Sequence, residues 1–404
     1  MLHRFRNAPG APPVLIAATD NYGILAVARA LRAAGYTPWL AVHKPGTYAA
    51  RSSAVAGTVP VPDPSFDPKG FVPELAVAAA RLSAAAVLPS GENHLLALAD
   101  READFAGIAF GVPSRESVNR ATHKGLLSTL GTAAGLRTPP TAKVVRGDTE
   151  AVGAFDFPAI LKPLYSLVRN PDGTMLGYSV RHVTVEQAEE AVKGLPERGG
   201  LVQPYIPGQL ISVSGVSWEG EIVCALHQLS IRTWPMHVGG SSYAVTIQSD
   251  EELERGVGRL LGELGWSGIF QVQFVRDPGG EHYLIDINPR VYGTLGLATA
   301  AGLNLPGIWT DLLLGKSPRV DGYRIGVRFR HEEKDIRALI RLLLVGDGER
   351  WGALQGFLPR RKTAHAIFAL HDPMPLLTSA AKLLKSSSAE RADPQASRKT
   401  RQSW

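Results

Sequence analysis

The 404-residue sequence predicts a mixed α/β and α+β fold class, with an N-terminal open parallel α/β domain followed by a larger region rich in consecutive strands. Three observations lead to this prediction. The first 120 residues alternate short apolar strands with helices, which is typical of βαβ units. The middle of the chain has strands that follow one another, including a polar hairpin at residues 268–290. The length also exceeds what one ordinary core holds, so two or three lobes are expected.

The composition is that of a globular chain. Hydrophobic residues make up 45% and charged residues 20% of the sequence, which argues against general disorder. The single cysteine, Cys224, excludes a disulfide framework and a cysteine-rich metal site. No apolar run is long enough to span a bilayer, and residues 1–13 lack the apolar core of a signal peptide. A cytoplasmic enzyme is therefore expected.

The net charge of +6 is concentrated at the C-terminus, because residues 376–404 hold six basic and two acidic side chains. The rest of the chain is near neutral, so nucleic acid is not expected as a partner. Residues 386–404 are expected to be a disordered basic tail. The basic residues 360–362 and 376–385 favour either weak contact with an acidic membrane surface or, more simply, a solvated helix and tail.

The N-terminal segment predicts strands at residues 14–18, 36–42, 58–61, 85–88 and 107–110, with helices up to Ala34 and near 68–82 and 93–100. It lacks Gly-x-Gly-x-x-Gly, so a dinucleotide site is not expected. Loops 19–23 and 90–94 follow strand ends, where open α/β sheets bind ligands. Their acids, Asp20 and Glu92, are suited equally to contacting an amine or to capping a helix.

The hairpin at residues 268–290 carries polar side chains at every second position of its strands. Residues two apart on a strand share a face, so Asp286, Asn288 and Arg290 lie together. Gln271 and Gln273 share a face of the first strand in the same way. Carboxylate and amide oxygens suit Mg²⁺, and an adjacent arginine can hold a phosphate or a carboxylate by two hydrogen bonds. The alternative is a hairpin whose polar face simply meets water.

These residues resemble the metal-binding hairpin of the ATP-grasp superfamily, whose signature is an acid or glutamine on the first strand and Glu-x-Asn-Pro-Arg on the second. The sequence of residues 272–274 is most similar to the carbamoyl-phosphate-synthase-like branch, including its stand-alone carboxylate–amine ligases. Asp286 stands in place of the usual glutamate. The resemblance implies a pre-ATP-grasp domain before a two-lobed ATP-grasp fold, with Gln273, Asp286 and Asn288 as metal ligands. It implies ATP as cosubstrate and Mg²⁺, or Mn²⁺ in its place.

Two lysines match nucleotide-binding positions of this superfamily. Lys124, at the start of a helix ending near Gly135, matches the lysine that reaches the nucleotide phosphates, although alone it would read as a surface lysine. Lys162 ends an apolar strand between Pro158 and Pro163, where a lysine needs an anionic partner. It resembles the second nucleotide lysine, with a structural ion pair as the alternative.

Residues 201–208 resemble the hinge that holds adenine through backbone groups, with the carbonyl of Pro204 and the N–H of Ile206 in the binding positions. The superfamily's ribose-binding acid falls at Leu210, and Gln209 is a possible substitute. The loop at 166–177 occupies the place of the phosphate-covering loop but has only two glycines. The resemblance thus implies nucleotide contacts by a set of seven residues: Lys124, Lys162, Gln203, Pro204, Tyr205, Ile206 and Gln209.

Strands are further expected at residues 211–218, 222–232 and 243–247, with a helix at 250–264. Arg232 and the glycines of 239–240 bracket a loop that reads either as an anion-binding rim or as an ordinary β-bend. Helices are expected at 291–301, 305–314 and 335–345, and a strand at 323–330. The expected domains are 1–120 (pre-ATP-grasp), 121–315 (ATP-grasp), 316–385 (an α/β extension) and the tail 386–404.

The function that the resemblance implies is an ATP-dependent carboxylate–amine ligase that works through an acyl phosphate. Its partners would be a small-molecule carboxylate and an amine, and a homo-oligomer is compatible with the sequence. Arg290 and Arg232 would be the catalytic residues, holding the carboxylate and the transferring phosphoryl group. A different class stays open, namely a catalytically weak nucleotide-binding regulatory or scaffold protein, because Gln273 is neutral and Asp286 is short.

Overall fold

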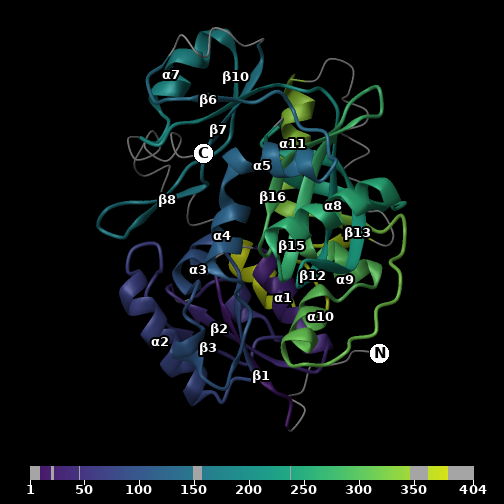
Figure 1. Ribbon diagram of the computed structural model, residues 1–404. Coiled ribbons are helices and arrows are strands. Elements are labelled where there is room, and N and C mark those ends of the chain that lie inside the picture. Colours follow the sequence, from purple (N-terminus) through teal and green to yellow (C-terminus); the bar gives the residue numbers. More distant parts are fainter. Residues whose placement is uncertain are drawn as a thin grey trace, which may run out of the picture.

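The computed structural model describes residues 10–19, 22–44, 46–148, 157–236, 238–345 and 363–380 (Figure 1). These residues build three sheets and a separate two-stranded ladder. The N-terminal sheet is all parallel, and the two later sheets are antiparallel except for one edge pair. The expected order of an open parallel α/β domain followed by a two-lobed region is confirmed.

The N-terminal sheet has the strand order β3-β2-β1-β4-β5. Its strands are β1 (Pro13–Ala17), β2 (Thr37–Val42), β3 (Gly57–Pro60), β4 (Ala86–Pro89) and β5 (Ala109–Phe110). The central strand β1 is buried on both faces, as expected for an uninterrupted apolar run in a parallel sheet.

Three helices flank this sheet: α1 (Tyr22–Ala33), α2 (Pro68–Arg81) and α3 (Glu92–Leu98). On one face, Leu15 and Ala17 of β1 pack with Phe71 and Leu75 of α2. On the other face, Ile16 belongs to a larger core that continues through α1 into the C-terminal half of the chain. The N-terminal sheet and the C-terminal half of the chain therefore share one apolar core. This packing positions the loop after β4 next to the candidate site.

Two helices, α4 (Arg115–Thr122) and α5 (Lys124–Ala133), lead into the small lobe. Its sheet has the order β10-β7-β11-β6 and is accompanied by α7 (Ala188–Lys193), at the top of Figure 1. The strands are β6 (Ala142–Val144), β7 (Ala159–Pro163), β10 (Arg181–Val183) and β11 (Gly200–Pro204). Between β7 and β10, the strands β8 (Leu167–Arg169) and β9 (Met175–Gly177) form the separate ladder.

The largest sheet has seven strands in the order β16-β15-β12-β13-β14-β17-β18. They are β12 (Gln209–Trp218), β13 (Glu221–Trp234), β14 (Gly240–Ile247), β15 (Gly268–Arg276), β16 (His282–Asn288), β17 (Arg328–Arg330) and β18 (Thr363–His365). On one face, Phe270, Val272 and Phe274 pack on the amphipathic helix α8 (Glu251–Leu264). On the opposite face, α9 (Leu295–Ala301) and α10 (Leu305–Leu313) join the core shared with α1.

The last described helix, α11 (Glu332–Val345), packs on the same large sheet beside β13 and β14. The part of the expected extension that the structure describes thus adds β17, α11 and β18 to the large sheet. The strand expected at 323–330 is shorter, because only Arg328–Arg330 pairs with β14. The helix expected at 291–301 begins later, at Leu295. Asp20, residues 360–362 and the tail 386–404 lie outside the described residues.

Candidate functional site

The hairpin β15–β16 places its polar residues on one face of the large sheet. Gln271 pairs with Asn288 and Gln273 pairs with Asp286 across the two strands. The register shifts immediately after Gln273, which leaves Ile285 as an extra residue in β16. From Asp286 onward, residues two apart therefore share a face of β16, as expected. At the bulge, Ile285 has no partner residue in β15, so its carbonyl lies outside the regular strand pairing.

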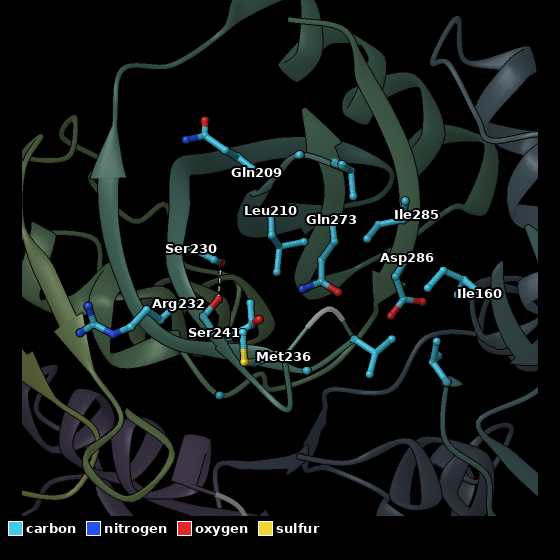
Figure 2. Close-up of a pocket in the computed structure, with 18 of the residues that line it drawn as sticks. Ile160, Gln209, Leu210, Ser230, Arg232, Met236, Ser241, Gln273, Ile285 and Asp286 are labelled. Carbon is cyan, nitrogen blue, oxygen red and sulfur yellow. Dashed lines mark hydrogen bonds between the residues drawn. The ribbon is translucent and has the colours of Figure 1, made fainter. Parts of the chain in front are cut away.

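This face borders a cavity of about 920 Å³ between the small lobe and the large sheet. The volume lies near the upper end of the range usual for small-molecule sites. Residues of the hinge, the hairpin β15–β16, the tip of β13–β14 and α11 line it (Figure 2). Among the residues expected to form the site, eleven line the cavity: Lys162, Gln203, Pro204, Tyr205, Ile206, Gln209, Arg232, Gln273, Asp286, Asn288 and Arg290. Lys124 is not among the lining residues.

Asp286 is the centre of charge in this site. Lys124, at the first position of α5, donates from Nζ to Asp286 Oδ1 at 2.7 Å. Burial raises the pKa of the Asp286 carboxyl, but Lys124, Lys162 and Arg290 outweigh burial and hold that pKa below its usual value. Three cations thus converge on one carboxylate, an excess of positive charge that suits a polyanionic ligand.

Lys162 is buried at the end of β7, with 7% of its surface exposed. Its Nζ donates a 2.7 Å hydrogen bond to the carbonyl oxygen of Ile285, the bulged residue of β16. Burial lowers the pKa of Lys162 to about 8, with Asp286 opposing and Lys124 reinforcing that effect. The ion pair considered as the alternative does not occur among the described residues, because the partner of Lys162 is a neutral carbonyl.

The remaining hairpin groups form a short hydrogen-bonded chain. Arg290 donates from Nη2 to Asn288 Oδ1 at 3.0 Å and from Nη1 to the Val291 carbonyl at 3.1 Å. Asn288 in turn donates from Nδ2 to Gln273 Oε1 at 3.4 Å. One carboxylate and two amide oxygens are hard ligands that fit Mg²⁺ when phosphate and water complete its shell. The described residues contain no cluster of three histidine, cysteine or acidic side chains that would hold a metal unaided.

Glu92 approaches this cluster from the N-terminal domain, where it opens α3. Its Oε1 is inaccessible to solvent and has no hydrogen-bond partner within the described ranges. Burial raises the pKa of Glu92 despite the nearby charges of Arg290 and Lys124. A hydrogen bond from the Leu167 backbone also reaches Glu92. Of the two alternatives, helix cap or ligand contact, its position beside Arg290 favours the contact.

The hinge continues β11 at the edge of the cavity. Gln203 donates from Nε2 to Thr141 Oγ1 at 2.8 Å, so its side chain is engaged within the small lobe. The Tyr205 N–H donates to the Pro158 carbonyl at 3.0 Å. The Ile206 N–H has no acceptor among the described residues, as an adenine-binding N–H requires.

Leu210 and Gln209 line the cavity together, but only Leu210 points toward its centre (Figure 2). The Gln209 side chain is exposed, points away from Gln273 and Asp286, and accepts a hydrogen bond from Arg276 Nη2. A ribose contact by Gln209 therefore requires that this hydrogen bond be exchanged.

Arg232 was expected to bind the substrate carboxylate or the phosphoryl group, but its guanidinium is bound to Asp335. Its Nε and Nη2 donate to the two oxygens of Asp335 at 2.7 and 3.0 Å, and its guanidinium lies 4.4 Å from the ring centroid of Tyr243. Asp335 is 1% exposed and also pairs with Arg330 at 3.0 Å. Arg232 lines the cavity, yet its planar fork is already occupied, and it points away from Asp286 (Figure 2).

Asp335 is a partner of Arg232 that was not predicted from the sequence. Asp335 precedes Ala338 and Leu339 on the buried side of an amphipathic helix. An acid within an apolar stripe needs a cationic partner, and that signal was available from the sequence.

The glycine-poor loop forms the ladder β8–β9 and lies against the N-terminal domain. Met175 N donates to the Ser65 carbonyl at 2.6 Å, and Arg169 Nη2 donates to the Leu96 carbonyl at 3.3 Å. None of residues 166–177, all of which the structure describes, contributes to the cavity wall. Within this loop, a hydrogen bond from Gly173 N to the Asn170 carbonyl at 2.9 Å closes a turn.

Comparison with known proteins finds a family model that matches part of the chain. A family model described as "ATP-grasp in the biosynthetic pathway with Ter operon" matches residues 197–334, which span the hinge, the hairpin and the start of α11. Within these residues the chain carries the pattern of an ATP-grasp domain. It is similar to the carbamoyl phosphate synthase large chain of Halomonas eurihalina, with 23% identity over 274 residues, 64% of this chain and 24% of that protein. The chain thus matches about a quarter of the length of this relative.

Solved structures share the fold. The biotin carboxylase domain of 2-oxoglutarate carboxylase from Hydrogenobacter thermophilus, solved with MgADP and bicarbonate, has a TM-score of 0.57 at 16% identity and covers 78% of this chain and 73% of its own. An L-amino acid ligase from Bacillus licheniformis gives 0.56 at 15% identity, covering 75% and 74%. The N5-carboxyaminoimidazole ribonucleotide synthetase of Thermus thermophilus gives 0.57 at 19%, covering 77% and 81%.

No described helix combines the length and the apolar character needed to cross a membrane.

Proposed function

We propose that this chain is an ATP-dependent carboxylate–amine ligase that forms an amide through an acyl phosphate. The observation that carries the proposal is the convergence of Lys124, Lys162 and Arg290 on Asp286 at the wall of a 920 Å³ cavity. Such a site binds the phosphates of a nucleotide and has space left for a second substrate. We also propose the domain boundaries expected from the sequence, with residues 121–315 as the ATP-grasp domain.

The nucleotide would lie between the small lobe and the large sheet. The Pro204 carbonyl and the Ile206 N–H would hold adenine at the hinge, because the Ile206 N–H has no acceptor among the described residues. Lys162 would hold a phosphate with its Nζ, which now donates only to the Ile285 carbonyl. Lys124 would do the same once its pairing with Asp286 is relaxed.

Asp286, Asn288 and Gln273 would hold Mg²⁺, or Mn²⁺ in its place, and the ion would supply neutralisation of phosphate charge. Arg290 would hold the substrate carboxylate by two hydrogen bonds next to the γ-phosphate. The residues then act by placing the carboxylate oxygen in line with the phosphoryl group and by stabilising the charge that develops. Arg232 would act indirectly, as a positioning residue for the wall of the cavity, because Asp335 occupies its guanidinium.

Glu92 would receive the amine from the N-terminal side. A carboxyl whose pKa is raised by burial is suited to accept a proton from an attacking ammonium near neutral pH. The buried Oε1 of Glu92 accepts no hydrogen bond from the described residues, so it can accept one from the amine.

Hydroxylamine trapping tests the ligase reaction. The purified chain is incubated with ATP, Mg²⁺ and a panel of carboxylic acids, with hydroxylamine in place of the amine. An acyl phosphate would be converted to a hydroxamate with stoichiometric ADP, and reactions without ATP or without acid would give none. ADP release that no acid stimulates, combined with tight MgATP binding, would favour the nucleotide-binding regulatory class instead.

A further inference from the structure

One wall of the cavity contains groups that the nucleotide and the reacting carboxylate do not need. We call it the α11 wall, and it consists of Arg232, Met236, His331, Lys334, Ala338 and Leu342. Four of these residues follow helical spacing. Positions 334, 338 and 342 lie on one face of α11, and position 331, directly before the helix, continues the same face. Figure 2 shows Arg232 on the opposite side of the cavity view from Ile160 and Asp286.

Lys334 places a positive charge in this wall that no carboxylate of the described chain pairs with. It is half-buried, and no ion pair links it to a carboxylate of the described chain. Its acidic neighbours are engaged elsewhere: Glu333 pairs with Arg337 at 2.7 Å, and Glu332 accepts from the Phe368 N–H at 2.8 Å. Burial lowers the pKa of Lys334, with the charge of Glu333 opposing. An ammonium in that setting is stabilised by an anion that enters from the cavity.

The neighbouring charge cluster does not supply that anion. Asp335 is shared by Arg232 and Arg330, with pair distances of 2.7 and 3.0 Å. Because two guanidinium groups already hold this carboxylate, it is not available to balance the charge of Lys334.

Three members of the α11 wall are apolar: Met236, Ala338 and Leu342. Ala338 is 2% exposed, while Met236 is 37% exposed at the tip of the β13–β14 hairpin. Leu342 continues the stripe two turns beyond Lys334. A ligand that fits this wall needs an apolar body that ends in an anion.

We propose that the α11 wall is a specificity subsite for a substrate with a second anionic group, a carboxylate or phosphate joined by an apolar linker to the reacting carboxylate. This inference rests on the proposed ligase function, because the reacting carboxylate is the one at Arg290. The nucleotide phosphates do not explain Lys334, since Lys124, Lys162 and Arg290 gather at Asp286 to receive them. Lys334 selects the second anion by a charge-assisted hydrogen bond.

The test uses the full chain loaded with MgADP and direct binding measured by calorimetric titration. The probes are straight-chain dicarboxylates of increasing length, each compared with its own monoamide, which has the same shape and one charge fewer. For the best-fitting length, the dicarboxylate should bind about tenfold more tightly than its monoamide, the value of one charge-assisted hydrogen bond. Lys334→Met should abolish that ratio without changing MgADP affinity.

Arg337→Met is the matched control, because Arg337 lies on the same helix, half exposed and paired with Glu333. It should keep the dicarboxylate-to-monoamide ratio. A ratio of one in the wild type at every length, or an unchanged ratio in Lys334→Met, would overturn the subsite. Hydroxamate from simple monocarboxylates without preference for dianions would overturn it as well and leave the ligase proposal standing. Dicarboxylate binding that depends on Lys334, without any hydroxamate, would support the subsite and refute the ligase.

Discussion

Lys162 donates a 2.7 Å hydrogen bond from Nζ to the carbonyl oxygen of Ile285, and this contact joins the small lobe to the large sheet. The carbonyl is available because Ile285 is the bulged residue of β16 and leaves the regular ladder. The ammonium is therefore fixed at the cavity wall with a neutral partner. Its charge remains available to an incoming phosphate.

This geometry predicts that nucleotide binding takes up a proton above pH 8. Burial lowers the pKa of Lys162 to about 8, so the free protein loses this proton as the pH rises through that value. A bound phosphate restores the charged form. The binding enthalpy of MgATP near pH 8.5 should therefore vary with the ionisation enthalpy of the buffer, as measured by calorimetry.

Lys162→Met should remove the buffer dependence and weaken MgATP binding by more than about tenfold, beyond the value of an exposed charge. Lys143→Met is the control, because Lys143 is exposed on β6 of the same lobe. Equal affinities in the two variants would place Lys162 outside the nucleotide site.

The depressed pKa of Lys162 also predicts the pH dependence of stability. Between about pH 8 and the usual lysine pKa, the unfolded chain holds this proton and the folded chain does not. The free energy of unfolding should therefore gain a rising component over that interval. Urea titrations at several pH values would detect it as a difference between wild type and Lys162→Met.

Asp286→Asn should reduce the metal dependence of nucleotide binding. The variant loses a metal ligand, so Mg²⁺ should strengthen ATP binding less than it does in the wild type. It also leaves Lys124 without its 2.7 Å carboxylate partner, so metal-free ATP should bind more tightly than in the wild type. Titrations with ATP in Mg²⁺ and in EDTA measure both effects. Identical Mg²⁺ dependence in the variant and the wild type would exclude Asp286 as a ligand.

Arg290→Lys should impair acyl phosphate formation much more than ATP binding. A lysine cannot reproduce the planar two-point contact of the guanidinium. Loss of one such preorganised donor typically lowers the rate about 10²–10³-fold. Hydroxamate formation and MgATP affinity, measured side by side, separate the two roles. Full hydroxamate yield from Arg290→Ala would remove this residue from the reaction while leaving the ligase assignment intact.

Glu92→Gln should slow amide formation from an amine substrate but preserve hydroxamate formation. Hydroxylamine is mostly neutral at pH 7 and can attack without first losing a proton, whereas an ammonium substrate must lose one before it attacks. Because burial raises its pKa, Glu92 binds a proton more tightly in the folded than in the unfolded state, so the free energy of unfolding falls as pH rises past the usual glutamate value. The variant should lack that component. Equal losses with both nucleophiles would argue against an amine-specific role.

Asp335→Ala should destabilise the fold strongly, since it leaves two guanidinium groups without their carboxylate. Removal of one partner from a buried ion pair typically costs about 3–5 kcal/mol. Asp321→Ala is the control, because its pair with Arg319 is exposed on both sides and should contribute less than about 1 kcal/mol. Urea unfolding provides both values. A change in Asp335→Ala as small as in the control would restore Arg232 as a candidate for direct substrate contact.

The sequence predicted helices and strands correctly where a regular spacing of apolar residues extended over the whole element. Helix α8 begins and ends almost where its apolar spacing predicts, and Gly265 closes it with a positive φ of 55°. The strand expected at 323–330 was too long, because its alternation continues beyond the part of the chain that finds a partner strand. Only Arg328–Arg330 lies beside β14, and pairing, not alternation, defines a strand.

The sequence by itself determined which side chains of the hairpin act together. The period of two in a strand places Asp286 and Asn288 on one face whatever the rest of the chain does. The tertiary structure alone decided their partners. Lys124 reaches Asp286 across 162 residues of chain, and Asp335 reaches Arg232 across 103. These contacts depend on how sheets and helices pack, since backbone periodicity extends only along one element whereas charge pairing requires separate elements to meet.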